Sequence, residues 1–146
     1  MFVRGTDSVA FFRYVRKHSV RIEYVAVYAN NLESMRDFFV KYFGAESSSG
    51  YRNPVTGFRS FFLSFGEGAR LEIMNSPKME DAEKSLFRTG YAHIAVSVGS
   101  RERVDEISAE LDRAGFRLLS GPRVTGDGYY ESCFLGPENN LIEITV

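Results

Sequence analysis

Two stretches of the chain, GFRSFFLSFGEGARLEI (57–73) and GYYESCFLGPENNLIEI (128–144), are two versions of one pattern. Each residue of the second stands 71 positions after its counterpart in the first, so that Glu72 matches Glu143. In both stretches, apolar residues alternate with polar ones on either side of a turn rich in Gly, Asn or Pro, which is typical of a β-hairpin. The chain therefore contains a duplicated unit.

The duplication extends toward the N-terminal side of each hairpin. RIEYVAVYA (21–29) resembles GYAHIAVSV (90–98), and in both the side chains alternate as they do in a strand. Each strand is followed by a helical pattern, over 30–44 and over 100–115. We expect Asn30 with Glu33, and Ser100, to cap these helices, and Gly44 and Gly115 to end them. Another strand is expected near 46–51 and near 116–120.

These elements predict an α+β fold of two tandem βαβββ modules. Together the modules would form a curved mixed sheet around a concave cleft, with the helices on the outer face. Residues 1–146 would be one domain, with module 1 over 21–75 and module 2 over 90–146. Residues 76–89 are expected to form a linker helix that begins at Ser76 and Pro77. Residues 1–20 would be a helical extension.

Composition narrows the class of protein. The chain has 146 residues, 44% of them hydrophobic, and a net charge of −1, which argues against nucleic acid as a partner. The sequence has no apolar run of about 20 residues, so we expect no membrane segment. The single cysteine, Cys133, excludes an internal disulfide and favours a cytoplasmic location. Its alternating surroundings indicate a buried, inert thiol.

Four residues carry the prediction of a site. Strand alternation places Tyr24, Glu72, His93 and Glu143 on the face of the sheet opposite the aliphatic residues. One glutamate in a strand often points to solvent at a sheet edge, but two at equivalent repeat positions suggest a shared role. A histidine and two carboxylates that converge on a cleft suit a divalent first-row metal.

The paired modules, with YAHIAVSV (91–98) and NLIEITV (140–146), resemble the vicinal oxygen chelate superfamily. Its members include glyoxalase I, bleomycin-resistance proteins and extradiol dioxygenases, and the closest likeness is to small bacterial glyoxalase-like proteins. The resemblance covers residues 21–146. It implies metal ligands on the first and last strands of each module, which here are Glu72, His93 and Glu143. The implied cofactor is a divalent ion such as Zn, Ni, Mn or Fe.

Tyr24 departs from this pattern, because glyoxalases have His or Gln at that place. A neutral phenol with a pKa near ~10 is a poor ligand for a divalent ion. We therefore expect Tyr24 to hydrogen-bond a ligand or a metal-bound water. The alternative is a site without metal, in which Tyr24 only packs.

Three further residues are candidates for the substrate cleft. The segment PRVTGDGYYES (122–132) joins two expected strands, either as a plain hairpin loop or as a lid that contributes Arg123 and Tyr130. Arg59 comes from the equivalent loop of module 1. An arginine at a cleft can bind a substrate carboxylate in a bidentate manner, although such side chains are more commonly solvated.

The resemblance implies a metal-dependent, lactoylglutathione-lyase-like enzyme for a small substrate with vicinal oxygens. Glu143 would be the catalytic base and would move a proton between adjacent carbons through an enediolate-type intermediate. The alternative is a non-catalytic protein that binds an antibiotic-type small molecule. Extradiol dioxygenation ranks last, since that chemistry uses two histidines. Partners would be a small molecule and a second copy of the chain. The modules can pair within one chain or across this homodimer.

Overall fold

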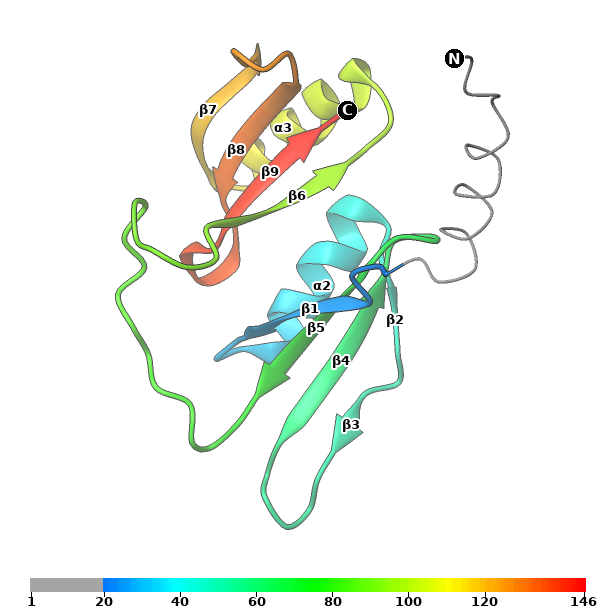
Figure 1. The fold of residues 1–146 in the computed structure, drawn as a ribbon, viewed down its shortest axis with the longest axis vertical. Coiled ribbons are helices and arrows are strands. Elements are labelled where there is room, and N and C mark those ends of the chain that lie inside the picture. The colour runs from blue at the N-terminus through cyan, green and yellow to red at the C-terminus, as the bar shows by residue number, and fades with distance from the viewer. Residues whose placement is uncertain (1–19) are drawn as a thin grey trace, which may run out of the picture.

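The computed structural model describes residues 20–146, which form two βαβββ modules in an α+β fold, as predicted (Figure 1). The expected N-terminal helix falls on residues 1–20, almost entirely outside the described residues. Module 1 contains β1 (Tyr24–Tyr28), α2 (Leu32–Phe43), β2 (Glu46–Ser47), β3 (Tyr51–Arg52), β4 (Arg59–Ser64) and β5 (Arg70–Asn75). Module 2 contains β6 (His93–Ser97), α3 (Arg101–Arg113), β7 (Arg117–Val124), β8 (Tyr130–Leu135), the 3-10 turn η1 (Pro137–Asn139) and β9 (Leu141–Thr145).

Each module has its own mixed sheet. In module 1 the strand order is β1-β5-β4-β2, with β3 also paired to β4, and in module 2 it is β6-β9-β8-β7. The first and last strands of each module are parallel, and their registers are equivalent, since Ala26 lies opposite Glu72 and Ala95 opposite Glu143. Strands β1 and β6 are sheet edges, so within one chain the modules do not share a continuous sheet.

One helix covers one face of each sheet. The predicted apolar stripe of α2 is buried against β4 and β5, where Leu63 and Ile73 have no exposed surface. In module 2, α3 buries Val104, Ile107 and Leu111 on the same kind of face. A buried hydrogen bond of 2.6 Å between the hydroxyls of Ser108 and Ser132 joins α3 to β8. Each helix-covered face is therefore a packed core, and function is left to the other face, which we term the open face.

The two cores join through aromatic rings. Phe116, just before β7, contacts Phe38 and Tyr42 on α2, with ring centres 5.0 and 5.9 Å apart. Buried residues of both modules accordingly form one hydrophobic cluster. Among residues 20–146, neither helix has the length and apolar character needed to cross a bilayer.

The prediction of a linker helix over 76–89 is wrong, because these residues contain no helix or strand. The linker crosses from one module to the other, at the left of Figure 1. An extended chain covers about 3.3 Å per residue and a helix about 1.5 Å, so an extended linker spans more distance between the modules than a helix of the same length in residues. Polar contacts along the way also compete with helix formation, such as the bond from Nδ2 of Asn30 to Oδ1 of Asp81 (2.7 Å).

Candidate functional site

The open face of module 2 brings together His93 and Glu143. They lie on the parallel strands β6 and β9, where His93 is opposite Leu141 and Glu143 is opposite Ala95, two positions further along the same face. Nε2 of His93 is 3.1 Å from Oε2 of Glu143, and the side chains are 39% and 20% exposed. Two of the three predicted metal ligands therefore share one point on the surface, where a third group can reach them.

Cys133 and Glu131 continue this open face on the neighbouring strand β8. Cys133 lies directly opposite Glu143, and Glu131 lies opposite Thr145. Burial raises the pKa of the Cys133 thiol, and the charges of Glu143 and Glu131 raise it further. Burial is also the main cause that raises the pKa of Glu131, followed by the charge of Glu143. The thiol is half-buried rather than buried, and its raised pKa favours the unreactive, protonated form.

Glu131 was not among the residues predicted from the sequence. The signal was present, since β8 alternates and its core residues Ser132 and Phe134 leave Glu131 and Cys133 on the other face. Arg123 on β7 lies opposite Glu131, which puts it on the open face too. Its charge acts against the other causes and lowers the pKa of Glu131.

The open face of module 1 holds Tyr24 and Glu72. Tyr24 is 47% exposed and packs edge-to-face on Phe62, with ring centres 5.2 Å apart. Phe62 lies directly opposite Glu72 in the β4–β5 pairing, and the Arg70 guanidinium is 4.6 Å from the Phe62 ring centre. This face is thus an aromatic surface with one carboxylate, while the face of module 2 carries the titratable groups.

Within residues 20–146 of one chain, Glu72 lies apart from the pair His93 and Glu143. In the part of the chain that the structure describes, no three side chains of the metal-binding types come together. Glu72 therefore does not join His93 and Glu143, and the described residues of one chain supply two donors at one point. An imidazole nitrogen and a carboxylate are suitable donors for a first-row metal, but the pair is half a site.

Arg59 and Tyr130 lie on the helix-covered faces. Arg59 forms an ion pair with Glu33 on α2, and this pairing lowers the pKa of Glu33. The hydroxyl of Tyr130 donates a 2.6 Å hydrogen bond to Asp105 on α3, and this bond raises the tyrosine pKa. Residues 125–129 form a hairpin turn, and Tyr130 belongs to β8 itself. Neither side chain is part of the open faces that carry Glu72, His93 and Glu143.

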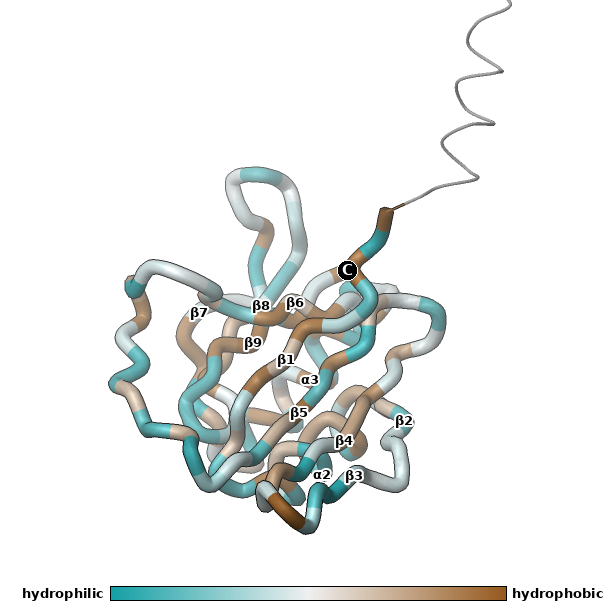
Figure 2. Tube along the Cα trace, turned by 60° about the horizontal axis from the view of Figure 1, so that its bottom comes forward, coloured by the Kyte–Doolittle hydropathy of each residue, from teal (hydrophilic) through white to brown (hydrophobic). Residues whose placement is uncertain are grey.

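An apolar groove of about 570 Å³ lies between the edge strands β1 and β6. Figure 2 shows hydrophobic segments of β1, β6 and β9 near this region. Ile22 and Tyr91 at the groove are 68% and 90% exposed. The aliphatic side chains that line it come from both modules: Val25, Val27, Leu71, Ile94, Val96 and Ile142.

Comparisons with known proteins agree with this architecture. The family model described as Glyoxalase/Bleomycin resistance protein/Dioxygenase superfamily matches residues 21–144. The chain is 18% identical to the glyoxalase I of Leishmania major, with a TM-score of 0.69, and the match covers 87% of this chain and 86% of the other. A glyoxalase family protein from Enterococcus faecalis is 23% identical, with a TM-score of 0.69 and coverage of 88% and 98%.

A third similar structure is that of an antibiotic resistance protein. The fosfomycin resistance protein of Listeria monocytogenes is 18% identical, with a TM-score of 0.64, and the match covers 88% of this chain and 93% of the other. A comparison with curated protein sequences gave no significant match. At these identities the solved structures support the fold and leave the reaction open.

Proposed function

Because the chain belongs to the Glyoxalase/Bleomycin resistance protein/Dioxygenase superfamily, we propose that it is a metal-dependent glyoxalase-like lyase or isomerase. Its substrate would be a small molecule with vicinal oxygens. The contact between His93 and Glu143 on an open sheet face is the observation that carries this proposal. Each residue comes from the strand on which the family resemblance expects a ligand.

The proposed site is completed by a second copy of the chain. Glu72 is the third expected ligand, and it does not join His93 and Glu143 in one chain. Among residues 20–146, both β1, next to Glu72, and β6, which carries His93, are unpaired edges. The apolar groove between them leaves aliphatic surface that a stable protein covers. In a homodimer, the open face of module 1 in one protomer would oppose the open face of module 2 in its partner.

In this composite site each side chain has a proposed role, and Glu143 has two. Glu72, His93 and Glu143 would hold a divalent ion, and such an ion would supply Lewis-acid chemistry that makes a C–H beside a substrate carbonyl more acidic. Glu143 would accept the proton from that carbon and return it to the adjacent carbon, so no proton is gained or lost overall. Tyr24, on the aromatic surface beside Phe62, would hydrogen-bond the substrate or a water. The half-buried setting of Glu143 limits competition from bulk water.

A non-catalytic binding protein is the second candidate. The observations that favour it are the aromatic surface of Tyr24 and Phe62 and the presence of only two donors at one point in a single chain. A protein of this kind would bind a flat small molecule on the rings without using a metal.

Metal content and titration separate the two candidates. We expect the purified protein to be dimeric and to bind Zn²⁺ or Ni²⁺ in isothermal titration. Glu143→Gln should abolish isomerase activity on thiol adducts of 2-oxoaldehydes while the fold is kept. Tyr24→His should tighten metal binding by about tenfold if the added ligand contributes ~1.4 kcal/mol. A dimer that binds neither ion, before or after the Tyr24 substitution, would favour the binding protein.

A further inference from the structure

Glu138 makes contacts in both modules from an unusual backbone conformation. It lies in η1, the turn between β8 and β9, with φ 56° and ψ 30°. Residues other than glycine adopt this left-handed region rarely. Oε1 of Glu138 accepts a 2.8 Å hydrogen bond from the backbone N–H of Asn31, the N-cap of α2 in module 1.

This contact completes the cap of a helix in the other module. The side chain of Asn31 accepts from the N–H of Ser34 (2.9 Å), which is one half of a capping box. The other half is normally a Glu or Gln three residues after the cap, which accepts from the cap's own N–H. Here that position is Ser34, and Glu138 takes the role from module 2. A carboxylate at this place also interacts favourably with the helix dipole.

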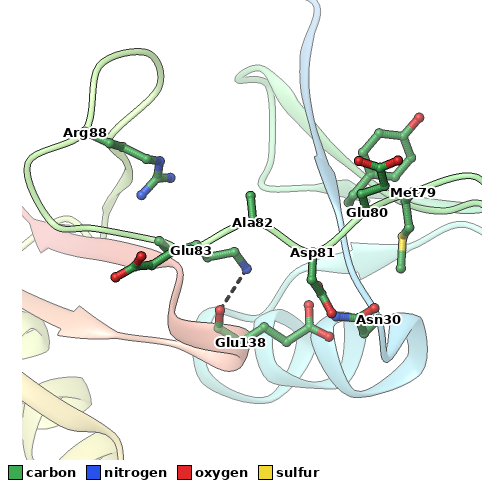
Figure 3. Close-up of a pocket in the computed structure, with 10 residues that line it drawn as sticks. Asn30, Met79, Glu80, Asp81, Ala82, Glu83, Arg88 and Glu138 are labelled. Carbon is green, nitrogen blue, oxygen red and sulfur yellow. Dashed lines mark hydrogen bonds between the residues drawn. The ribbon is translucent and has the colours of Figure 1, made fainter.

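The linker contributes to the same junction, which Figure 3 shows. Nζ of Lys84 donates a 2.8 Å hydrogen bond to the backbone carbonyl of Glu138, and Asn30 bonds Asp81. These residues line a polar pocket of about 220 Å³ between the linker, the start of α2 and η1. Three segments that are far apart in the sequence are thus tied together at Glu138.

The repeat provides an internal comparison. Glu67 is the counterpart of Glu138 in module 1, in the turn between β4 and β5. Glu67 is exposed, and α3 has its own cap at Ser100, whose side chain accepts from the N–H of Arg103. The contact across the module boundary is therefore specific to Glu138 and does not follow from the shared turn.

We infer that Glu138 is a positioning residue, whose carboxylate caps α2 across the module boundary and sets the angle between the two modules. The importance of this angle for activity rests on the proposed function. Strands β1 and β6 of one chain must stay apart, at a fixed separation, if each is to pair with a second copy and bring Glu72 to His93 and Glu143. Glu138 holds that separation without touching substrate or metal.

The test is a distance measurement between spin labels in the two modules. Labels at Ser49→Cys and Glu110→Cys, both exposed, in a Cys133→Ser background report the angle between modules. Labelled chains are mixed with an excess of unlabelled chains, so that only distances within one chain are measured. We expect Glu138→Ala to widen the distance distribution and to lower the unfolding midpoint by about 3–5 °C. Glu138→Gln keeps an acceptor oxygen and should restore the narrow distribution.

Glu67→Ala is the matched control and should change neither quantity. Lys84→Met removes only the bond to the Glu138 carbonyl and should widen the distribution partway, which keeps the test decisive if Glu138→Ala does not fold. A narrow distribution in both Glu138→Ala and Lys84→Met, or an equal effect of Glu67→Ala, overturns the inference. The measurement uses no metal or substrate. The inference about Glu138 can therefore be overturned while the proposed activity stands, and the proposed activity can be overturned while the inference stands.

Discussion

The ring of Phe38 on α2 meets the ring of Phe116 at an interplanar angle of 66°, and this contact joins module 1 to module 2. Phe38 is almost fully buried, while Phe116 is partly exposed and packs against the core from the other side of the boundary. The two modules therefore share apolar surface in addition to the polar junction at Glu138. Their unfolding should be coupled.

Phe116→Ala tests this coupling. Loss of the ring removes its contacts with Phe38 and Tyr42, and we expect a destabilisation of about 1–3 kcal/mol, below the usual cost for a fully buried phenylalanine. Chemical denaturation should also become less cooperative, since each module retains its own core. Phe116→Leu should recover most of the loss. A single, unshifted transition in Phe116→Ala would show that the rings do not couple the modules.

Ser108 and Ser132 should respond unequally to substitution. The hydroxyl of Ser108 donates to the carbonyl of Val104 (2.6 Å) and can accept from Ser132. Ser108→Ala leaves the fully buried Ser132 hydroxyl without its partner, at a cost of about 1–3 kcal/mol. In Ser132→Ala, Ser108 keeps its bond to Val104, so the loss should be smaller. Equal losses in thermal unfolding would contradict this hydrogen-bond order.

Cys133 can report on the charge of Glu143. Burial and the two nearby carboxylates raise the thiol pKa, so alkylation by iodoacetamide at pH 8 should be slow. Glu143→Gln removes one opposing charge and should speed alkylation by about twofold or more, in a site that solvent partly screens. The remote, exposed Asp112→Asn provides the comparison and should leave the rate unchanged. A slower reaction in Glu143→Gln would rule out this charge effect.

Glu131 should make stability depend on pH in the direction opposite to a salt-bridged acid. Its pKa in the folded chain is raised above 4.5, mainly by burial, so ionisation is harder in the folded state than in the unfolded state. Well below pH 4.5 the group is protonated in both states and costs nothing. As pH rises through the raised pKa, the unfolded state ionises more readily than the folded state, so the free energy of unfolding falls. Glu131→Gln should therefore be more stable than the natural chain at pH 7 and equal to it near pH 3, by urea denaturation.

The sequence predicts those parts of the site that depend on strand alternation within one module. His93 and Glu143 follow from the parallel copies of one pattern, and the structure places them in contact. Arg59 and Tyr130 were expected in the cleft as loop residues, but each lies within a strand, where alternation turns it toward its helix. The proximity of Glu72 to the pair depends on how modules associate, which no local pattern encodes.

The start of helix α2 is a second feature that local sequence patterns do not fully predict. The cap of α2 is Asn31, and Glu33, expected to pair with Asn30, binds Arg59 instead. Asn30 and Asn31 are equally good caps in sequence. Asn31 is the one whose backbone N–H donates to Glu138, 107 residues away, and no local pattern predicts this contact. The linker also makes a long-range contact, between Asn30 and Asp81, and does not form the helix that Ser76 and Pro77 suggest.

The parallel pairing of the first and last strands has a consequence for how the chain is made. Strand β1 cannot pair with β5, its sheet neighbour within residues 20–146, until β5 has left the ribosome, and β6 must likewise wait for β9. Antiparallel pairs such as β2–β4 and β7–β8 can form earlier, but the sheet of each module is complete only when its last strand has been made. Module 1 can complete its sheet before β9 exists, but Asn31 receives the Glu138 carboxylate only after residue 138 has been made, so this part of the α2 cap is added after module 1 is complete.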